Sequence, residues 1–89
     1  MNMITNHLPT AELQALDAAH HVHPFTHNAA LAKKGSRVIT RARGVTLTDS
    51  DGNEMLDAMA GLWCVNVGYG REELSEVAAR QMRELPYYN

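Results

Sequence analysis

The sequence has little cysteine and no excess of basic charge. Cys64 is its single cysteine, which excludes an intrachain disulfide and makes the cytoplasm the expected location. Eight Lys and Arg stand against ten Asp and Glu, so a basic surface for nucleic acid is not expected. No apolar run approaches the ~18 residues of a transmembrane helix, and residues 1–6 lack the pattern of a secretory leader. We therefore expect neither a nucleic acid nor a membrane among its partners.

Aromatic side chains are also too few for a large core. One Trp, one Phe and three Tyr occur among 89 residues. A chain of this length buries only about 60–65% of the surface that it exposes when unfolded, so a core of its own would be marginal. The composition still suits a folded segment, because 45% of the residues are hydrophobic and 20% are charged. A small domain and a part of a larger protein fit these numbers equally well.

One helix is expected near the start of the chain. Pro9 followed by Thr10 is typical of a helix start, with Thr10 as the capping residue. Glu12 then falls in the first turn, where a carboxylate favours the helix dipole. Pro24 is expected to end this helix because it lacks an N–H group. Residues 25–35 show no regular period and are expected to be irregular.

A second helix is expected over residues 71–85. Its first turn is acidic, its last turn is basic and Pro86 stops it. Its apolar residues fall on one side of the helix. They are Leu74, Val77, Ala78, Met82 and Leu85.

Between the two helices, residues 37–57 predict a small antiparallel sheet. Residues 37–48 are rich in β-branched side chains and are interrupted by Gly44. Residues 49–52 (Asp-Ser-Asp-Gly) are a turn signal, after which residues 54–57 can return antiparallel. A sheet of this size is weak alone and needs a helix or another domain against its apolar face.

Residues 58–70 form an uncharged apolar segment with three glycines. Glycine at such density indicates close approach of the backbone to a packing partner or a ligand. The whole chain is therefore predicted to be an α+β segment, with an N-terminal helix, a small antiparallel β-meander and a C-terminal helix. We divide it into residues 1–36 (helix and loop), 37–70 (sheet and glycine-rich loop) and 71–89 (helix).

Possible metal, phosphate and nucleophile sites are weak. Four histidines lie close together, but Pro24 interrupts the helix that would align them, so polar residues at a helix end are preferred to a zinc site. Residues 68–70 (Gly-Tyr-Gly) before a helix allow phosphate binding or a simple corner, and we prefer the corner because the Lys-Ser/Thr of a P-loop is missing. Cys64 is expected to be a small buried hydrophobe. The histidines are His20, His21, His23 and His27.

Residues 43–70 resemble the opening of class III aminotransferases. The family typically has a G-x-x-L-x-D-x-x-G-x-x-x-x-D pattern, an uncharged segment ending in a glycine corner, and then a helix. Residues 23–25 (His-Pro-Phe) resemble the family's leading segment, and residues 84–89 its continuation toward the catalytic domain. Residues 61–63 (Gly-Leu-Trp) point to the ω-amino acid–pyruvate branch. The pattern is matched by Gly44, Leu47, Asp49, Gly52 and Asp57.

The resemblance implies the N-terminal segment of a fold-type I (α/β) enzyme that depends on pyridoxal 5'-phosphate (PLP). Such an enzyme passes an amino group from an amine or ω-amino acid to PLP and then to a keto acid such as pyruvate, and acts as a homodimer. Trp63 would be one aromatic wall of the substrate pocket, Phe25 a second wall, and Leu62 a lining residue. Core packing is the alternative role for Trp63.

No residue of this chain is assigned to catalysis, to PLP or to a metal. Lys33 and Lys34 match no Schiff-base motif, and the family's cofactor-binding groups lie downstream of the region seen here. A non-catalytic α+β binding or interaction module is therefore kept as the alternative function, and a zinc module as a third.

Overall fold

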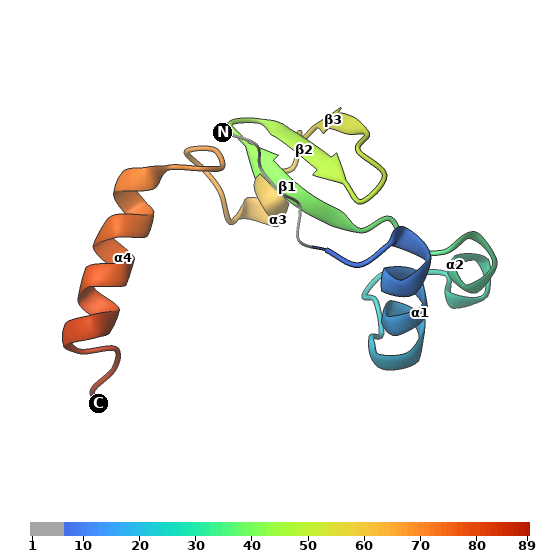
Figure 1. Ribbon diagram of the computed structural model, residues 1–89, viewed down its shortest axis with the longest axis horizontal. Helices are drawn as coiled ribbons and strands as arrows, with labels where there is room; N and C mark the ends of the chain where they lie inside the picture. Colours follow the sequence, from blue (N-terminus) through green and yellow to red (C-terminus); the bar gives the residue numbers. More distant parts are fainter. Residues whose placement is uncertain (1–6) are drawn as a thin grey trace.

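The computed structural model describes residues 7–89, so the expectation about a leader in residues 1–6 lies outside the described part. A three-stranded sheet lies between a pair of helices at one end and a longer helix at the other (Figure 1). The α+β arrangement predicted from the sequence is confirmed. The elements are α1 (Thr10–His20), α2 (Asn28–Lys34), β1 (Ile39–Arg43), β2 (Thr46–Asp49), β3 (Glu54–Leu56), α3 (Ala60–Trp63) and α4 (Glu72–Glu84).

The sheet is an antiparallel meander in the order β1-β2-β3, as predicted. Arg43 pairs with Thr46 across the first hairpin, and Thr48 pairs with Glu54 across the second. The register of β1 shifts between Ile39 and Arg41, which marks a bulge. The second hairpin turns at Gly52, whose φ of +88° favours glycine, and its N–H donates to the Asp49 carbonyl at 3.0 Å.

α1 differs from the sequence prediction at both ends. The residue before it is Pro9, no side chain caps it, and the expectation that Thr10 is the cap is wrong. The helix ends at His20, so the expectation that Pro24 ends it is also wrong. The chain turns back early because His23 reaches the preceding helix, where its Nε2 lies 2.8 Å from Asp17 Oδ2.

α2 occupies a segment that was expected to be irregular, and that expectation is wrong. Its sequence, Asn-Ala-Ala-Leu-Ala-Lys-Lys, has high helix propensity that the missing hydrophobic period concealed. His27 precedes the helix, and its Nδ1 accepts a hydrogen bond from the Ala30 N–H at 3.1 Å. Gly35 ends the helix with a φ of +79° and a ψ of 151°, a backbone conformation that glycine adopts readily because it has no Cβ.

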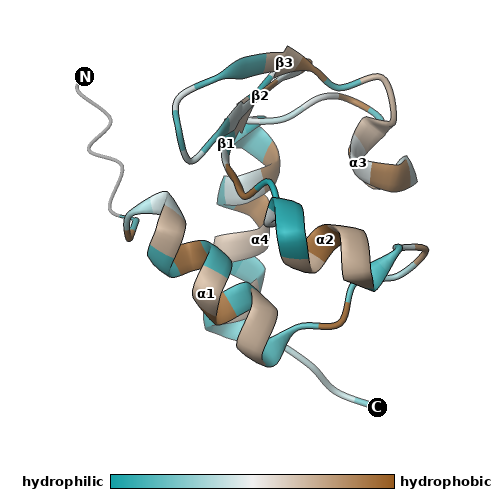
Figure 2. Ribbon diagram, turned by 90° about the vertical axis from the view of Figure 1, so that its right-hand side faces the viewer, coloured by the Kyte–Doolittle hydropathy of each residue, from teal (hydrophilic) through white to brown (hydrophobic). Residues whose placement is uncertain are grey.

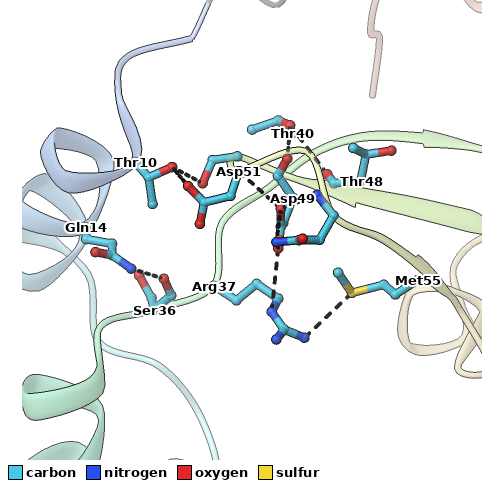
Figure 3. A network of polar contacts seen from close by, with 11 residues as sticks. Thr10, Gln14, Ser36, Arg37, Thr40, Thr48, Asp49, Asp51 and Met55 are labelled. Carbon is cyan, nitrogen blue, oxygen red and sulfur yellow. Dashed lines mark hydrogen bonds and ion pairs between the residues drawn. The ribbon is translucent and has the colours of Figure 1, made fainter.

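Polar contacts attach α1 to the meander (Figure 3). Thr10 Oγ1 lies 2.8 Å from Ser50 Oγ and 2.7 Å from Asp51 Oδ1. Gln14 Nε2 donates to the Ser36 carbonyl at 2.9 Å. The hydroxyl that was expected to cap α1 therefore joins the helix to the second hairpin instead.

α4 confirms the predicted C-terminal helix and stands apart from the rest of the chain (Figure 1). Its first turn contains Glu72 and Glu73 and its last turn Arg83, as the helix dipole favours. Leu74, Val77 and Met82 on its apolar side are all more than half exposed. The helix therefore has a hydrophobic side that no other described residue covers.

The described residues contain no buried hydrophobic side chain. The radius of gyration is 16.1 Å, whereas a compact domain of this length would have about 12 Å. The accessible surface is 7927 Å², against about 5,200 Å² for a compact monomer of this mass. The chain is thus an extended arrangement of elements whose apolar faces are open. Within residues 7–89, none of the helices has the length and apolar character needed to cross a bilayer.

Candidate functional site

The uncharged segment after the sheet folds into a left-handed turn at α3. The φ angles are +50° at Ala60, +56° at Gly61, +60° at Leu62 and +71° at Trp63. Only glycine adopts this region readily, and other residues pay roughly 1–2 kcal/mol each. Ala60, Leu62 and Trp63 therefore hold an unfavourable backbone, which persists only where surrounding contacts impose it.

Backbone hydrogen bonds close the turn. The Trp63 N–H donates to the Met59 carbonyl at 3.1 Å. The N–H groups of Cys64 and Val65 both donate to the Ala60 carbonyl, at 2.8 and 2.9 Å. The segment that was expected to be a loop thus has a defined internal geometry.

Asp57 holds the start of the turn with both carboxylate oxygens. Its Oδ1 accepts from the Met59 N–H at 2.8 Å, and its Oδ2 accepts from the Gly61 N–H at 2.9 Å. The Tyr69 hydroxyl donates to the same Oδ2 at 2.6 Å. The Tyr69 hydrogen bond, followed by the two backbone N–H groups, lowers the pKa of Asp57 below its ordinary value. The carboxyl is therefore ionised at neutral pH, the form that the three hydrogen bonds to its oxygens favour.

Tyr69 is fixed in turn by its own backbone. Its N–H donates to the Gly44 carbonyl at 2.9 Å and its carbonyl accepts from the Gly44 N–H at 3.0 Å. Gly68 allows this approach because a Cβ there would lie 3.1 Å from the Gly44 carbonyl oxygen. The hydrogen bond to Asp57 raises the pKa of the Tyr69 hydroxyl, which keeps it protonated as a donor.

Gly61 is required at this turn for two separate reasons. Its φ of +56° is unfavourable for other residues. A Cβ at this position would also lie 2.8 Å from the Tyr69 hydroxyl oxygen and 3.2 Å from a Val65 methyl carbon. A side chain at residue 61 would therefore separate Tyr69 from Asp57.

The turn presents Leu62 and Trp63 outward. Leu62 is 58% exposed and Trp63 is 84% exposed, and α3 extends from below the strands in Figures 1 and 2. Phe25, the other residue assigned to the substrate pocket, belongs to the connection between α1 and α2 and is fully exposed. The structure thus brings Leu62 and Trp63 together on one turn and carries Phe25 on a separate segment.

Cys64 is exposed, so the expectation that it is a small buried hydrophobe is wrong for this chain. Among the described polar groups, the Cys64 thiol contacts only the Leu62 carbonyl, at 3.4 Å.

The histidines and the glycine corner have structural contacts. His23 pairs with Asp17, and this hydrogen bond lowers the pKa of the Asp17 carboxyl. Within residues 7–89, no three His, Cys, Asp or Glu side chains are grouped closely enough to hold a metal ion. At the corner, the N–H groups of Gly68 and Tyr69 donate to the carbonyls of Val65 and Gly44. The N–H groups of Gly68 and Tyr69 are therefore already bonded within the chain.

Asp57 and Tyr69 were not identified from the sequence as parts of one unit. Asp57 matched the family pattern without a role, and Tyr69 was read only as part of a glycine corner. The available signal was Asp57 with Gly61 four positions later, because an aspartate can accept hydrogen bonds from backbone N–H groups that shortly follow it. The partnership with Tyr69 spans 12 residues and depends on the tertiary arrangement.

Comparison with known proteins decides the family. The sequence model of the family described as aminotransferase class-III matches residues 29–89. The chain belongs to this family. The class III assignment made from residues 43–70 is thereby confirmed. The site is therefore interpreted as part of an enzyme family, not of an unspecified binding module.

Individual relatives agree with this class III assignment. The chain is 61% identical over 89 residues to a putrescine–pyruvate aminotransferase of Pseudomonas aeruginosa, which covers 100% of this chain and 20% of the relative. A taurine–pyruvate aminotransferase of Rhodobacter capsulatus is 40% identical over 79 residues, 88% of this chain and 17% of its own length. The structure of an (S)-enantioselective ω-transaminase from Thermomicrobium roseum superposes with a TM-score of 0.80 at 48% identity, over 84% of this chain and 17% of that one.

The class III chain spans about a fifth or less of the length of these relatives. The family implies PLP, but residues 7–89 do not form a site for it. Lys33 and Lys34 lie exposed in the last turn of α2, and the nearby Asp17 carboxylate is engaged by His23. No acidic partner for a pyridinium nitrogen is therefore free beside these lysines, and we derive no reaction step from this chain.

Proposed function

We propose that this chain is the N-terminal part of a PLP-dependent aminotransferase that moves an amino group from an amine or ω-amino acid to a keto acid such as pyruvate. Relatives named for putrescine and for taurine share pyruvate in their names, which supports pyruvate as the acceptor. The PLP-binding groups would come from outside this chain. The active enzyme would be a cytoplasmic homodimer, because the class III resemblance implies a homodimer and the single cysteine suits a reducing compartment.

The observation that carries the proposal is the turn that presents Leu62 and Trp63. An exposed indole on a strained but firmly bonded backbone suits a pocket wall, because a flat rigid side chain shapes an apolar slot at low entropic cost. Phe25 would form a second wall from the N-terminal segment. The role of this chain would be to shape the amine slot and exclude water from it.

Replacing Trp63 tests the proposal. Trp63→Ala in the full-length enzyme should change the ratio of kcat/KM for benzylamine and putrescine, with pyruvate as acceptor, by about tenfold or more, because a large wall is removed. Its midpoint of thermal unfolding should fall by only a few degrees, whereas Trp63→Phe should keep most of the donor preference because it retains a flat ring.

The opposite pattern would contradict the assignment. If Trp63→Ala unfolds the protein while the remaining activity keeps its donor preference, Trp63 is a core residue. An enzyme that transfers no amino group from either amine to pyruvate would contradict the proposed reaction itself.

A further inference from the structure

We propose that Asp57 and Tyr69 are positioning residues that set amine-donor preference, because their hydrogen-bonded pair holds the turn that presents Leu62 and Trp63. This inference rests on the proposed function and extends it to two residues with no assigned role. Asp57 and Tyr69 act through the backbone of α3, so their effect on a substrate is transmitted by the side chains that follow them.

The turn needs support that its own hydrogen bonds do not fully provide. Ala60, Leu62 and Trp63 all have positive φ, and each favours a right-handed or extended backbone when it is released. The Asp57 carboxylate binds the N–H groups of Met59 and Gly61, at 2.8 and 2.9 Å, immediately before Leu62. The Met59 contact fixes the carboxylate just before the turn, and the Gly61 contact depends on the positive φ of Ala60, so the carboxylate favours the start of the left-handed path.

Tyr69 ties this support to the sheet. Its hydroxyl lies 2.6 Å from Asp57 Oδ2, and its main chain pairs with Gly44 at the hairpin between β1 and β2. The Asp57 N–H also donates to the Val45 carbonyl in that hairpin, at 2.8 Å. The hairpin thus holds Asp57 in two ways, through Tyr69 at its carboxylate and through Val45 at its backbone N–H. These contacts set the direction of the turn relative to the strands.

Asp49 offers a matched control at the other end of β2. Its Oδ1 accepts from the N–H groups of Asp51 and Asn53 at 3.0 and 2.9 Å. This carboxylate therefore holds a hairpin turn much as Asp57 holds α3, but the turn carries no residue assigned to the pocket. A purely structural effect of losing a bonded carboxylate should appear in Asp49→Asn as well.

Tyr69→Phe in the full-length enzyme is the decisive variant, because it removes one hydroxyl and leaves the ring and the pairing with Gly44. We expect the kcat/KM ratio for benzylamine and putrescine, with pyruvate as acceptor, to shift by about fivefold to tenfold. The change should lie mainly in KM, since the walls of the pocket move and the reacting groups do not. Asp57→Asn should shift the ratio in the same direction, and Asp49→Asn should lower stability with the ratio within about twofold of the unmodified enzyme.

Hydrogen exchange gives a readout that does not depend on activity. In the unmodified enzyme, the amides of Met59 and Gly61 should exchange more slowly than the amide of Asn66. Tyr69→Phe should speed exchange at Met59 and Gly61 and leave the strands β1 and β2 unchanged. Fast exchange of these two amides in the unmodified enzyme overturns the inference.

The kinetic outcomes separate this inference from the proposed function. If Trp63→Ala shifts the donor ratio and Tyr69→Phe does not, the proposed function stands and the positioning role is overturned. An equal shift in Asp49→Asn overturns it too, because the effect is then a general loss of stability. If Trp63→Ala leaves the ratio unchanged, the assignment of Trp63 to the pocket and the positioning role both fail, while transfer of an amino group to pyruvate would still support the proposed reaction.

Discussion

Gly61 is constrained both by its positive φ and by the close approach of Tyr69, and a comparison with Gly52 separates the two effects. Gly61 and Gly52 both have positive φ, at +56° and +88°, but a Cβ at Gly52 would meet nothing within 4 Å. Gly52→Ala should therefore cost only the backbone strain, roughly 1–2 kcal/mol of unfolding free energy. Gly61→Ala should cost about 1–3 kcal/mol more, because its new methyl group displaces the Tyr69 hydroxyl.

Urea unfolding of the full-length protein measures both variants. Equal costs for Gly61→Ala and Gly52→Ala would mean that Tyr69 moves aside without loss. In that case the close approach of Tyr69 to Gly61 would contribute nothing beyond the conformational preference of glycine.

The residues assigned to the pocket illustrate what could be read from sequence at this scale. The resemblance named Trp63, Leu62 and Phe25, and their assignment remains a prediction. Sequence reasoning did not find the left-handed path at Ala60, Leu62 and Trp63, because residues with side chains rarely adopt it and no local pattern signals it. The left-handed path is explained only by the contacts that stabilise it, chiefly those of Asp57.

Among the elements, α4 gives the sharpest expectation. Val77 is 53% exposed in this chain, yet it lies on the apolar side of an amphipathic helix, which normally packs against another element. Val77→Asp should lower the unfolding free energy of the full-length enzyme by about 2–4 kcal/mol, since it buries a charge without a partner. In the 89-residue chain alone the same change should have no measurable effect.

Glu76→Ala is the control for this prediction, because residue 76 lies on the opposite side of α4. It should be tolerated in both settings. Chemical denaturation followed by circular dichroism measures the full-length variants, and the helix content from circular dichroism compares the variants of the 89-residue chain. Tolerance of Val77→Asp in the full-length enzyme would mean that the apolar side of α4 stays in water.

The elements themselves were predictable to different degrees. The meander and α4 follow from β-branched runs, a turn signal and a clear helical period, and all were found. α2 was missed because its seven residues are too short to show a period, and its capping residue is a histidine. The end of α1 was misplaced because the pairing of His23 with Asp17, six residues earlier, was not expected from the sequence. The division at residues 36 and 70 remains a prediction.

At the scale of the whole molecule, the open apolar faces predict that the chain does not fold stably on its own. The chain alone, without a buried hydrophobic side chain among its described residues, should show no cooperative thermal unfolding transition and should bind the dye ANS. Differential scanning calorimetry and dye fluorescence of the 89-residue chain measure this. A sharp transition without dye binding would instead mean that the chain folds on its own and covers its apolar faces itself.

The exposed side of α4 has a consequence for biosynthesis. Relatives are about five times as long as this chain, so under the proposed function roughly 350 residues follow it during translation. At a synthesis rate of about 5–20 residues per second, Leu74, Val77 and Met82 would stay uncovered for roughly 20–70 seconds. During that interval the apolar side of the nascent helix is a binding site for chaperones. A chaperone bound there would protect the unfinished enzyme from aggregation until the rest of the chain is synthesised.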